Sequence, residues 1–237
     1  MSSGTYVIAG GSSGIGLELV RQLAASAARI DVWSRTVGGL EPGGVVRHPA
    51  CDFAAADGPL PEPPDAVHGA VYCPGTITLK SFRSLGLADF RHDLEVNLLG
   101  AVRFLQAVQP RLAGIDGGPA SVVLFSTVAV GQGMPMHASV ASAKGAVEGL
   151  VRSLAAEWAP KVRVNAIAPA LTDTPLAGRL LSSPEKREAL ATRYPLKRLG
   201  APADAAALAK FLLSAESGWM TGQVLGLDGG MSTLRVS

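Results

Sequence analysis

A glycine-rich turn near the start of the chain is the feature of this sequence that most restricts its fold. The short apolar run Thr5–Ala9 is followed directly by Gly10-Gly11-Ser12-Ser13-Gly14-Ile15-Gly16. Glycines permit a tight turn and let the backbone approach a pyrophosphate closely, and a helix that begins here offers free N–H groups and the positive end of its dipole. The turn therefore predicts a dinucleotide site in the first strand–helix unit of an α/β domain.

Short apolar runs alternate with helix-length segments along the rest of the chain, which is typical of a parallel sheet with crossover helices. A length of 237 residues fits one domain of this kind. We expect a single domain over residues 1–237 with a Rossmann-type, doubly wound parallel sheet of about seven strands. The expected strands are Thr5–Ala9, Arg29–Trp33, Val45–His48, Gly69–Tyr72, Ser121–Phe125, Arg163–Ala166 and Gln223–Leu227. The expected helices are Gly14–Ala25, Ala88–Leu112, Pro135–Trp158, Leu176–Ala191 and Pro202–Ser214.

Two connections are too rich in helix breakers to hold crossover helices. Residues 36–44 contain four glycines and one proline, and prolines occupy positions 59, 61, 63 and 64. Glycine and proline are the poorest helix formers, so we expect no helix beyond one turn in 36–44 and an irregular chain over 59–64. The crossovers after the second and third strands are thus shortened, and the adenosine end of a bound dinucleotide should be open to solvent.

Composition excludes several classes of function. The formal net charge is +2 and only 17% of residues are charged, without a Lys/Arg cluster, so we expect neither a nucleic-acid nor a membrane partner. No metal site is expected. Cys51 and Cys73 lie in apolar segments and are interpreted as free thiols in a reducing compartment, although a structural disulfide is an alternative. No leader pattern or membrane-spanning run is visible, so the cytoplasm is the expected location.

Seven motifs in order along the chain resemble the short-chain dehydrogenase/reductase family. They are the Gly-x-x-x-Gly-x-Gly turn, Asp52 after the third strand, Asn97 in Glu95-Val96-Asn97-Leu98-Leu99-Gly100, the strand Ser121–Thr127, Ala143-Lys144-Gly145-Ala146-Val147, Val164-Asn165-Ala166-Ile167-Ala168-Pro169, and Leu227-Asp228-Gly229-Gly230. One departure is Tyr72-Cys73-Pro74-Gly75, where the family has an Asn-Asn-Ala-Gly-like turn, and another is Ala170 in place of a glycine.

The resemblance implies a nicotinamide dinucleotide site. Asp52 would bond the adenine amino group, Lys144 the nicotinamide ribose, and Thr174 or Thr172 the carboxamide. Ser34 and Arg35 stand where NAD-binding members keep an acidic residue, so a guanidinium and hydroxyls are available for a 2′-phosphate, and NADP(H) is favoured over NAD(H). The complete expected cofactor set is Gly10, Ser12, Ser13, Gly14, Ile15, Gly16, Ser34, Arg35, Asp52, Phe53, Gly75, Lys144, Pro169, Thr172 and Thr174.

The resemblance breaks at the family's catalytic tyrosine, which lies four residues before the lysine. Counting back from Lys144 gives Val140, which cannot transfer a proton. The family's serine falls at Thr127, with Ser126 as the alternative, and its asparagine at Asn97. His137, three residues before Val140, is a candidate replacement acid or base, because i and i+3 share a helix face and imidazole titrates near neutral pH. A pocket-wall role is its alternative. Lys144 is the fourth catalytic candidate, and cofactor binding alone is the other reading of it.

Three functions remain open from the sequence. The first is an NADP(H)-dependent oxidoreductase that reduces a carbonyl or imine, or oxidises the alcohol, with an altered proton relay. The second is a catalytically silent cofactor-binding subunit or sensor. The third is a non-redox enzyme that uses His137 or Lys144 as an acid or base. Residues 174–194 are expected to form a lid over a small-molecule substrate. The resemblance implies a homodimer or homotetramer, or pairing with a related subunit.

Overall fold

The computed structural model describes residues 3–235, which form one domain around a seven-stranded parallel sheet. The strand order is β3-β2-β1-β4-β5-β6-β7, so the direction of travel across the sheet reverses between β1 and β4. Ligands of open α/β sheets bind beyond the carboxyl ends of the strands at such a reversal. The strands are β1 (Thr5–Ala9), β2 (Arg29–Trp33), β3 (Val46–Arg47), β4 (Gly69–Tyr72), β5 (Ala120–Phe125), β6 (Val162–Pro169) and β7 (Val224–Leu227).

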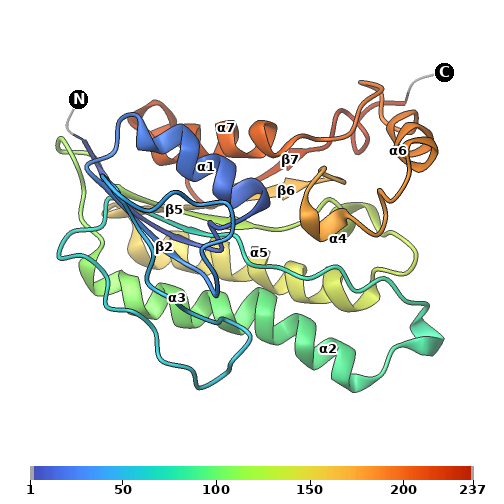
Figure 1. Ribbon diagram of the computed structural model, residues 1–237, viewed down its shortest axis with the longest axis horizontal. Helices are drawn as coiled ribbons and strands as arrows, with labels where there is room; N and C mark the ends of the chain where they lie inside the picture. Colours follow the sequence, from blue (N-terminus) through green and yellow to red (C-terminus); the bar gives the residue numbers. More distant parts are fainter. Residues whose placement is uncertain (1–2, 236–237) are drawn as a thin grey trace.

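Helices cover both faces of the sheet, as the doubly wound prediction requires (Figure 1). On one face lie α1 (Gly14–Ala24) and α7 (Pro202–Leu213), which pack against each other. The other face carries α5 (Ala138–Trp158) beside a longer rod, in which α2 (Leu87–Leu94) runs through a π-helical turn, Glu95–Leu99, into α3 (Gly100–Val108). The short helices α4 (Ala129–Gln132) and α6 (Pro184–Ala191) lie towards the carboxyl ends of the strands (Figure 1).

The core shows why these apolar runs form strands buried on both faces. Val7 packs into the cluster beneath α3 and α5, which includes Phe104, whereas its neighbour Ile8 packs into the cluster beneath α1, which includes Leu19. All four side chains are fully buried. Successive side chains of a strand point to opposite faces, so a parallel sheet covered on both sides requires a continuous apolar run rather than an alternating one.

Most of the expected elements are confirmed, but several boundaries are wrong and one helix was not expected. The third strand is shorter than expected. The helix expected over Ala88–Leu112 ends its regular part at Val108, because Pro110 lacks the N–H that a further turn would need. The helix expected from Pro135 begins at Ala138, and α4 was not expected. The helix expected over Leu176–Ala191 is α6 alone, preceded by a single 3-10 turn at Pro175–Ala177.

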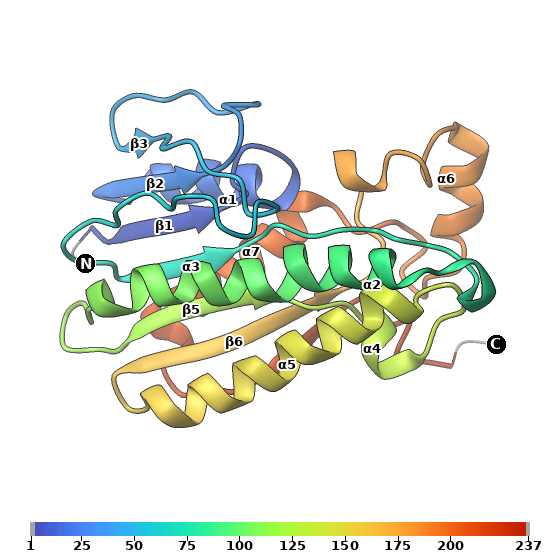
Figure 2. The ribbon, with the colours of Figure 1, turned by 90° about the horizontal axis from the view of Figure 1, so that it is seen from below.

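The two connections rich in glycine and proline contain no helix, as predicted. Residues 36–44 form turns and a bridge, and residues 59–64 are irregular. In Figure 2 the two-residue strand β3 lies at the edge of the sheet with a loop, and not a helix, leading into it. The end of β2 lies next to this edge of the sheet. The residues that follow β2 are therefore covered by a loop and not by a crossover helix. Within residues 3–235, no helix is long and apolar enough to cross a membrane.

Candidate cofactor and catalytic site

The turn between β1 and α1 has the close backbone geometry that a pyrophosphate site needs. Gly10 has a φ of +72°, in the left-handed region that favours glycine. A Cβ placed on Gly16 would lie 2.5 Å from the backbone oxygen of Gly10, so only glycine fits there. Ser13 is extended and Gly14 begins α1, whose first N–H groups have no intrahelical partners. Residues Ser12 to Gly16 therefore place a helix N-terminus beside the end of β1.

At the end of β2, the structure separates the roles of Ser34 and Arg35. The Ser34 side chain is 5% exposed, and its hydroxyl donates to the backbone oxygen of Thr36 at 3.0 Å and lies 3.0 Å from His48 Nε2. Arg35 is exposed, and its guanidinium has no hydrogen bond or ion pair to another residue of the described chain. Arg35 is thus the group at this position that is available to a ligand.

The predicted adenine contacts lie after β3. Asp52 is exposed, and its Oδ1 accepts from the backbone N–H of Ala54 at 2.9 Å. Phe53 is buried and packs edge-to-face against Tyr72 and Phe104, with ring centroids 5.2 and 6.0 Å apart. The aromatic contacts fix the chain on which Asp52 is presented. Phe53 itself contributes packing and backbone at this position.

A cavity of about 420 Å³ opens at the carboxyl ends of β1, β4, β5 and β6. Besides Lys144, seven of the predicted functional residues line its wall, and much of the remaining wall is apolar. The predicted residues on it are Ile15, Gly75, Thr127, His137, Pro169, Thr172 and Thr174, and the apolar side chains include Ile77, Leu79, Met134, Leu176, Leu180 and Leu190. The topology therefore gathers residues from across the whole sequence around one space.

Lys144 and Val140 both lie on the wall of this cavity, one turn apart on α5. Lys144 is 7% exposed, and its Nζ donates to the backbone oxygen of Phe125 at 2.8 Å. Burial lowers the pKa of Lys144 to about 8, and the charges of Cys73 and Asp93 oppose that shift. The same burial raises the pKa of the Cys73 thiol to about 12. At neutral pH the lysine is mostly an ammonium, and the thiol is protonated.

Asn97 lies in the π-helical turn and is 1% exposed. Its Nδ2 donates to Thr76 Oγ1 at 2.7 Å and to the backbone oxygen of Asp93 at 2.8 Å, and its Oδ1 accepts from the backbone N–H of Thr76 at 3.4 Å. Asn97 thus braces the loop after β4, of which Gly75 and Thr76 line the cavity.

Thr127 and His137 occupy opposite ends of the segment that connects β5 to α5. Thr127 Oγ1 accepts from the backbone N–H of Ala129 at 3.3 Å, while Ser126 donates to Glu148 Oε1 at 2.8 Å. His137 precedes α5, and its Nδ1 lies 2.8 Å from the backbone oxygen of Pro135. A carbonyl only accepts, so Nδ1 carries the hydrogen, and in the neutral ring Nε2 has a free lone pair. Of the two hydroxyls, that of Ser126 already donates to Glu148, whereas that of Thr127 only accepts, so Thr127 is free to donate to a ligand.

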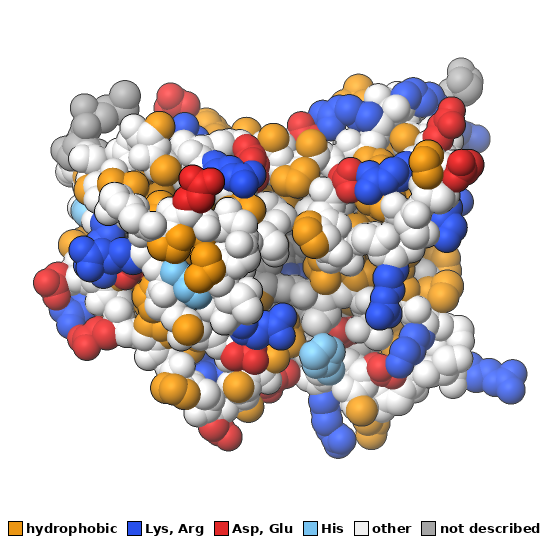
Figure 3. Space-filling view, in the orientation of Figure 1, with side chains coloured by type: hydrophobic (Ala, Val, Ile, Leu, Met, Phe, Trp, Pro, Cys, Tyr) orange, Lys and Arg blue, Asp and Glu red, His pale blue; other side chains and the backbone are white. Residues whose placement is uncertain are grey.

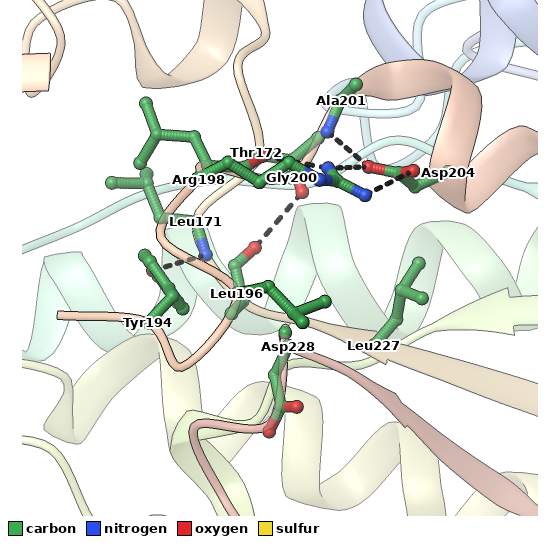
Figure 4. A pocket seen from close by; sticks show the side chains of 13 residues that line it. Leu171, Thr172, Tyr194, Leu196, Arg198, Gly200, Ala201, Asp204, Leu227 and Asp228 are labelled. Atoms are coloured by element: carbon green, nitrogen blue, oxygen red, sulfur yellow. Dashed lines mark hydrogen bonds and ion pairs between the residues drawn. The ribbon is translucent and has the colours of Figure 1, made fainter. Parts of the chain in front are cut away.

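Sequence reasoning missed Tyr194, which lines both this cavity and a smaller one of about 100 Å³. In Figure 4, which shows the smaller cavity, the Tyr194 hydroxyl accepts from the backbone N–H of Leu171 at 3.3 Å, and Arg198 pairs with Asp204. Burial raises the pKa of Tyr194. Tyr194 is the last residue of the expected lid segment 174–194. An aromatic residue at that position was the sequence signal that could have identified it.

Sequence reasoning also missed Asp93, which the structure buries behind the cavity. Its only signal was a charged residue one helical turn before Asn97, on the side of the helix that packs inward.

Charged side chains on the surface do not form a patch of one sign on the face in Figure 3, where Lys and Arg are interspersed with Asp and Glu. The charges that matter at this site are therefore individual side chains.

Comparison with known proteins identifies the family. A family model described as enoyl-(acyl carrier protein) reductase matches residues 62–232. A tropinone reductase homolog from Arabidopsis thaliana is 31% identical over 244 residues, which cover 96% of this chain and 92% of that protein. The 2-(S)-hydroxypropyl-CoM dehydrogenase 3 of Xanthobacter autotrophicus is 31% identical over 247 residues and is covered to 96%, as is this chain.

Solved structures agree with these sequence relatives. Aldohexose dehydrogenase from Thermoplasma acidophilum superposes with a TM-score of 0.86 at 25% identity, covering 99% of this chain and 96% of that one. A short-chain type dehydrogenase/reductase from Mycobacterium ulcerans gives a TM-score of 0.83 at 27% identity, covering 99% and 92%. The family model and the relatives each cover most of the chain, and so this protein belongs to the short-chain dehydrogenase/reductase family of nicotinamide-dependent oxidoreductases.

Proposed function

We propose that this protein is an NADP(H)-dependent reductase of an apolar carbonyl or imine compound, or oxidises the corresponding alcohol, with a proton relay that uses no tyrosine. The observation that carries the proposal is the shared cavity wall of Lys144 and Val140. The buried lysine is kept, the cavity is open, and only the phenol is missing. A silent cofactor-binding subunit would keep Lys144 for cofactor binding alone, so turnover is the measurement that separates the two functions.

The residues present fit the cofactor. The tight turn at Gly10 and Gly16 and the N-terminus of α1 would hold the pyrophosphate, as the close approach at Gly16 indicates. Arg35 would pair with a 2′-phosphate, and no acidic side chain stands at that position to repel it. Lys144 would contact the nicotinamide ribose, and Thr172 or Thr174 the carboxamide. When bound, the nicotinamide supplies or accepts the hydride.

The cavity wall supports an apolar substrate. Leu79, Met134, Leu176, Leu180 and Leu190 are among the apolar side chains that line it. Ligand cavities of this kind bind through apolar area and are oriented by a few polar groups. Thr127 is positioned to donate a hydrogen bond to the carbonyl or imine, because it lines the cavity and its hydroxyl hydrogen has no recorded acceptor in the described chain.

Two side chains on the wall can replace the proton function of the tyrosine. Lys144 is an ammonium below a pKa of about 8 and can release a proton to the nascent alkoxide. His137 presents Nε2, because Nδ1 is bonded to Pro135, and so can accept or return a proton. General acid–base catalysis contributes about 10²–10⁴ in rate, so either group would restore much of what the valine removes.

The deciding experiment measures NADPH oxidation against a panel of apolar ketones and cyclic imines. The parent protein should turn over at least one class, and Lys144→Met should lose that activity while remaining folded. A protein that binds NADPH tightly but turns over none of the panel, in either direction, would contradict the reductase proposal. That outcome would favour the cofactor-binding subunit instead.

A further inference from the structure

Asp93 is a buried carboxylate without an ion-pair partner in the described chain. Its carboxylate, on α2, is 0% exposed, and no cation lies within ion-pair distance of it in the described chain. Oδ1 accepts from Thr76 Oγ1 at 2.6 Å and from Thr78 Oγ1 at 2.8 Å, whereas the buried Oδ2 has no partner in residues 3–235. A buried carboxylate without a paired cation is strongly disfavoured, so its presence needs a compensating group.

Hydrogen bonds lead from Asp93 to the wall of the cavity. Thr76 Oγ1 donates to Asp93 and accepts from Asn97 Nδ2, and Thr76 lines the cavity. Asn97 and Lys144 then meet at Gly75. A Cβ placed on Gly75 would lie 3.2 Å from Asn97 Oδ1 and 3.5 Å from Lys144 Nζ. The carboxylate and the ammonium thus stand at the two ends of one polar cluster, separated by neutral groups.

Lys144 lacks a paired anion among the described residues, just as Asp93 lacks a paired cation. Within residues 3–235, Lys144 Nζ makes one hydrogen bond, to the neutral backbone oxygen of Phe125, and the described residues that line the cavity include no Asp or Glu. The other titratable groups on that wall are the Cys73 thiol after β4, His137 before α5, and Arg193 and Tyr194 from the lid. The Cys73 thiol is protonated at neutral pH, so the negative charge that acts on Lys144 there is that of Asp93. Attraction between buried charges extends over several ångströms.

We propose that Asp93 is the buried counter-ion of Lys144, held in place by Thr76 and Asn97, and that it keeps Lys144 an ammonium facing the cavity. Asp93 is a positioning residue, since it acts through Lys144 and touches no reacting atom. Its use in catalysis rests on the proposed function. When hydride reaches the carbonyl carbon, an N–H bond of Lys144 breaks as the alkoxide O–H bond forms. Lys144 is left as a neutral amine that water reprotonates.

The test is to titrate Lys144 in the protein without cofactor. NMR of protein labelled with ¹³C-lysine monitors this titration. Lys144→Met identifies the resonance. Asp93→Asn keeps an oxygen that can accept from Thr76 and Thr78 and removes only the charge. The Lys144 midpoint should fall in this variant, by on the order of one pH unit for the loss of a buried charge at this range. Glu95→Gln is the matched control on the same rod, and it should leave the midpoint unchanged.

A folded Asp93→Asn protein whose Lys144 titrates as in the parent would overturn the proposal. If Asp93→Asn does not fold, the reciprocal variant decides: Lys144→Met should move the ¹³C titration of the Asp93 carboxyl to higher pH, and an unmoved carboxyl would equally overturn it. Neither measurement needs turnover, so a protein that reduces nothing but shows these shifts would refute the reductase and retain the counter-ion. In an active protein, the fall of reduction rate with pH should begin earlier in Asp93→Asn, which a purely structural role would not produce.

Discussion

Val140 and Lys144 lie one turn apart on α5, and both side chains face the cavity at the carboxyl ends of the strands. Val140 is 6% exposed and borders about 420 Å³ of open space, so a larger side chain at position 140 can extend into the cavity rather than into the packed core. The position that lacks a proton-transfer group is therefore also the position that can accept one.

Val140→Tyr should raise the rate of reduction of a simple activated ketone. The phenol would lie beside the Lys144 ammonium, whose charge lowers the pKa of a neighbouring hydroxyl. A gain on the order of tenfold or more is expected, because a well-placed general acid contributes about 10²–10⁴. The measurement is NADPH oxidation under single-turnover conditions. Val140→Phe supplies the same ring without the hydroxyl, and an equal gain in that variant would show that volume, not proton transfer, is responsible.

The pH dependence of the reduction rate should follow the protonation state of Lys144. Its pKa is lowered to about 8 by burial, so the ammonium that releases the proton is present below that pH and is lost above it. Reduction should therefore fall as pH rises through about 8, while Lys144→Met should be slow and level over the same range. A parent rate that stays level across this window would exclude Lys144 as the donor.

His137→Ala should separate the two proton-transfer candidates. His137 lines the cavity, whereas His92 is an exposed histidine on α2 that does not. If His137 transfers the proton, its removal should lower turnover in both directions by about 10²–10⁴, and His92→Ala should have no effect. Brisk turnover that survives His137→Ala would leave Lys144, the substrate or an ordered water as the proton source.

The sequence predicted the parts of this site that depend on local pattern. The glycine turn, the doubly buried strands and the four-residue spacing of Val140 and Lys144 all follow from neighbouring residues. Asp93 did not, because its burial depends on packing between α2 and the loop after β4, which are brought together only by the tertiary fold. The helix expected over Leu176–Ala191 was too long for a local reason. Its alanines and leucines favour helix, but Ser183 caps Lys186 and restarts the helix at Pro184.

Arg35→Ala should reduce the preference for NADPH over NADH. Arg35 is exposed at the end of β2 without a recorded partner in residues 3–235, and Ser34 beside it is turned into the fold. One charge-assisted contact to a 2′-phosphate is worth about 1.5–3 kcal/mol, or about 10- to 150-fold in affinity. Fluorescence titration with each cofactor measures the difference. Arg83→Ala, an exposed arginine beyond β4, should leave it intact, and equal affinities in the parent would refute the preference.

Gly16→Ala should weaken both cofactors equally, unlike Arg35→Ala. The added Cβ would lie 2.5 Å from the backbone oxygen of Gly10 and 2.9 Å from Gly11 Cα, and backbone cannot move aside as a flexible side chain can. The turn must open, which displaces the N–H groups at the start of α1 from the predicted pyrophosphate position. The affinities for NADPH and NADH should both fall at least about tenfold, or about 1.4 kcal/mol. Gly149→Ala is the matched control, because a Cβ there meets nothing within 4 Å on an exposed turn of α5. It should bind both cofactors normally and raise the free energy of unfolding by about 1 kcal/mol, since alanine is the better helix former. Normal binding by a folded Gly16→Ala protein would mean that the pyrophosphate lies elsewhere, and the assignment of the β1–α1 turn would have to be abandoned.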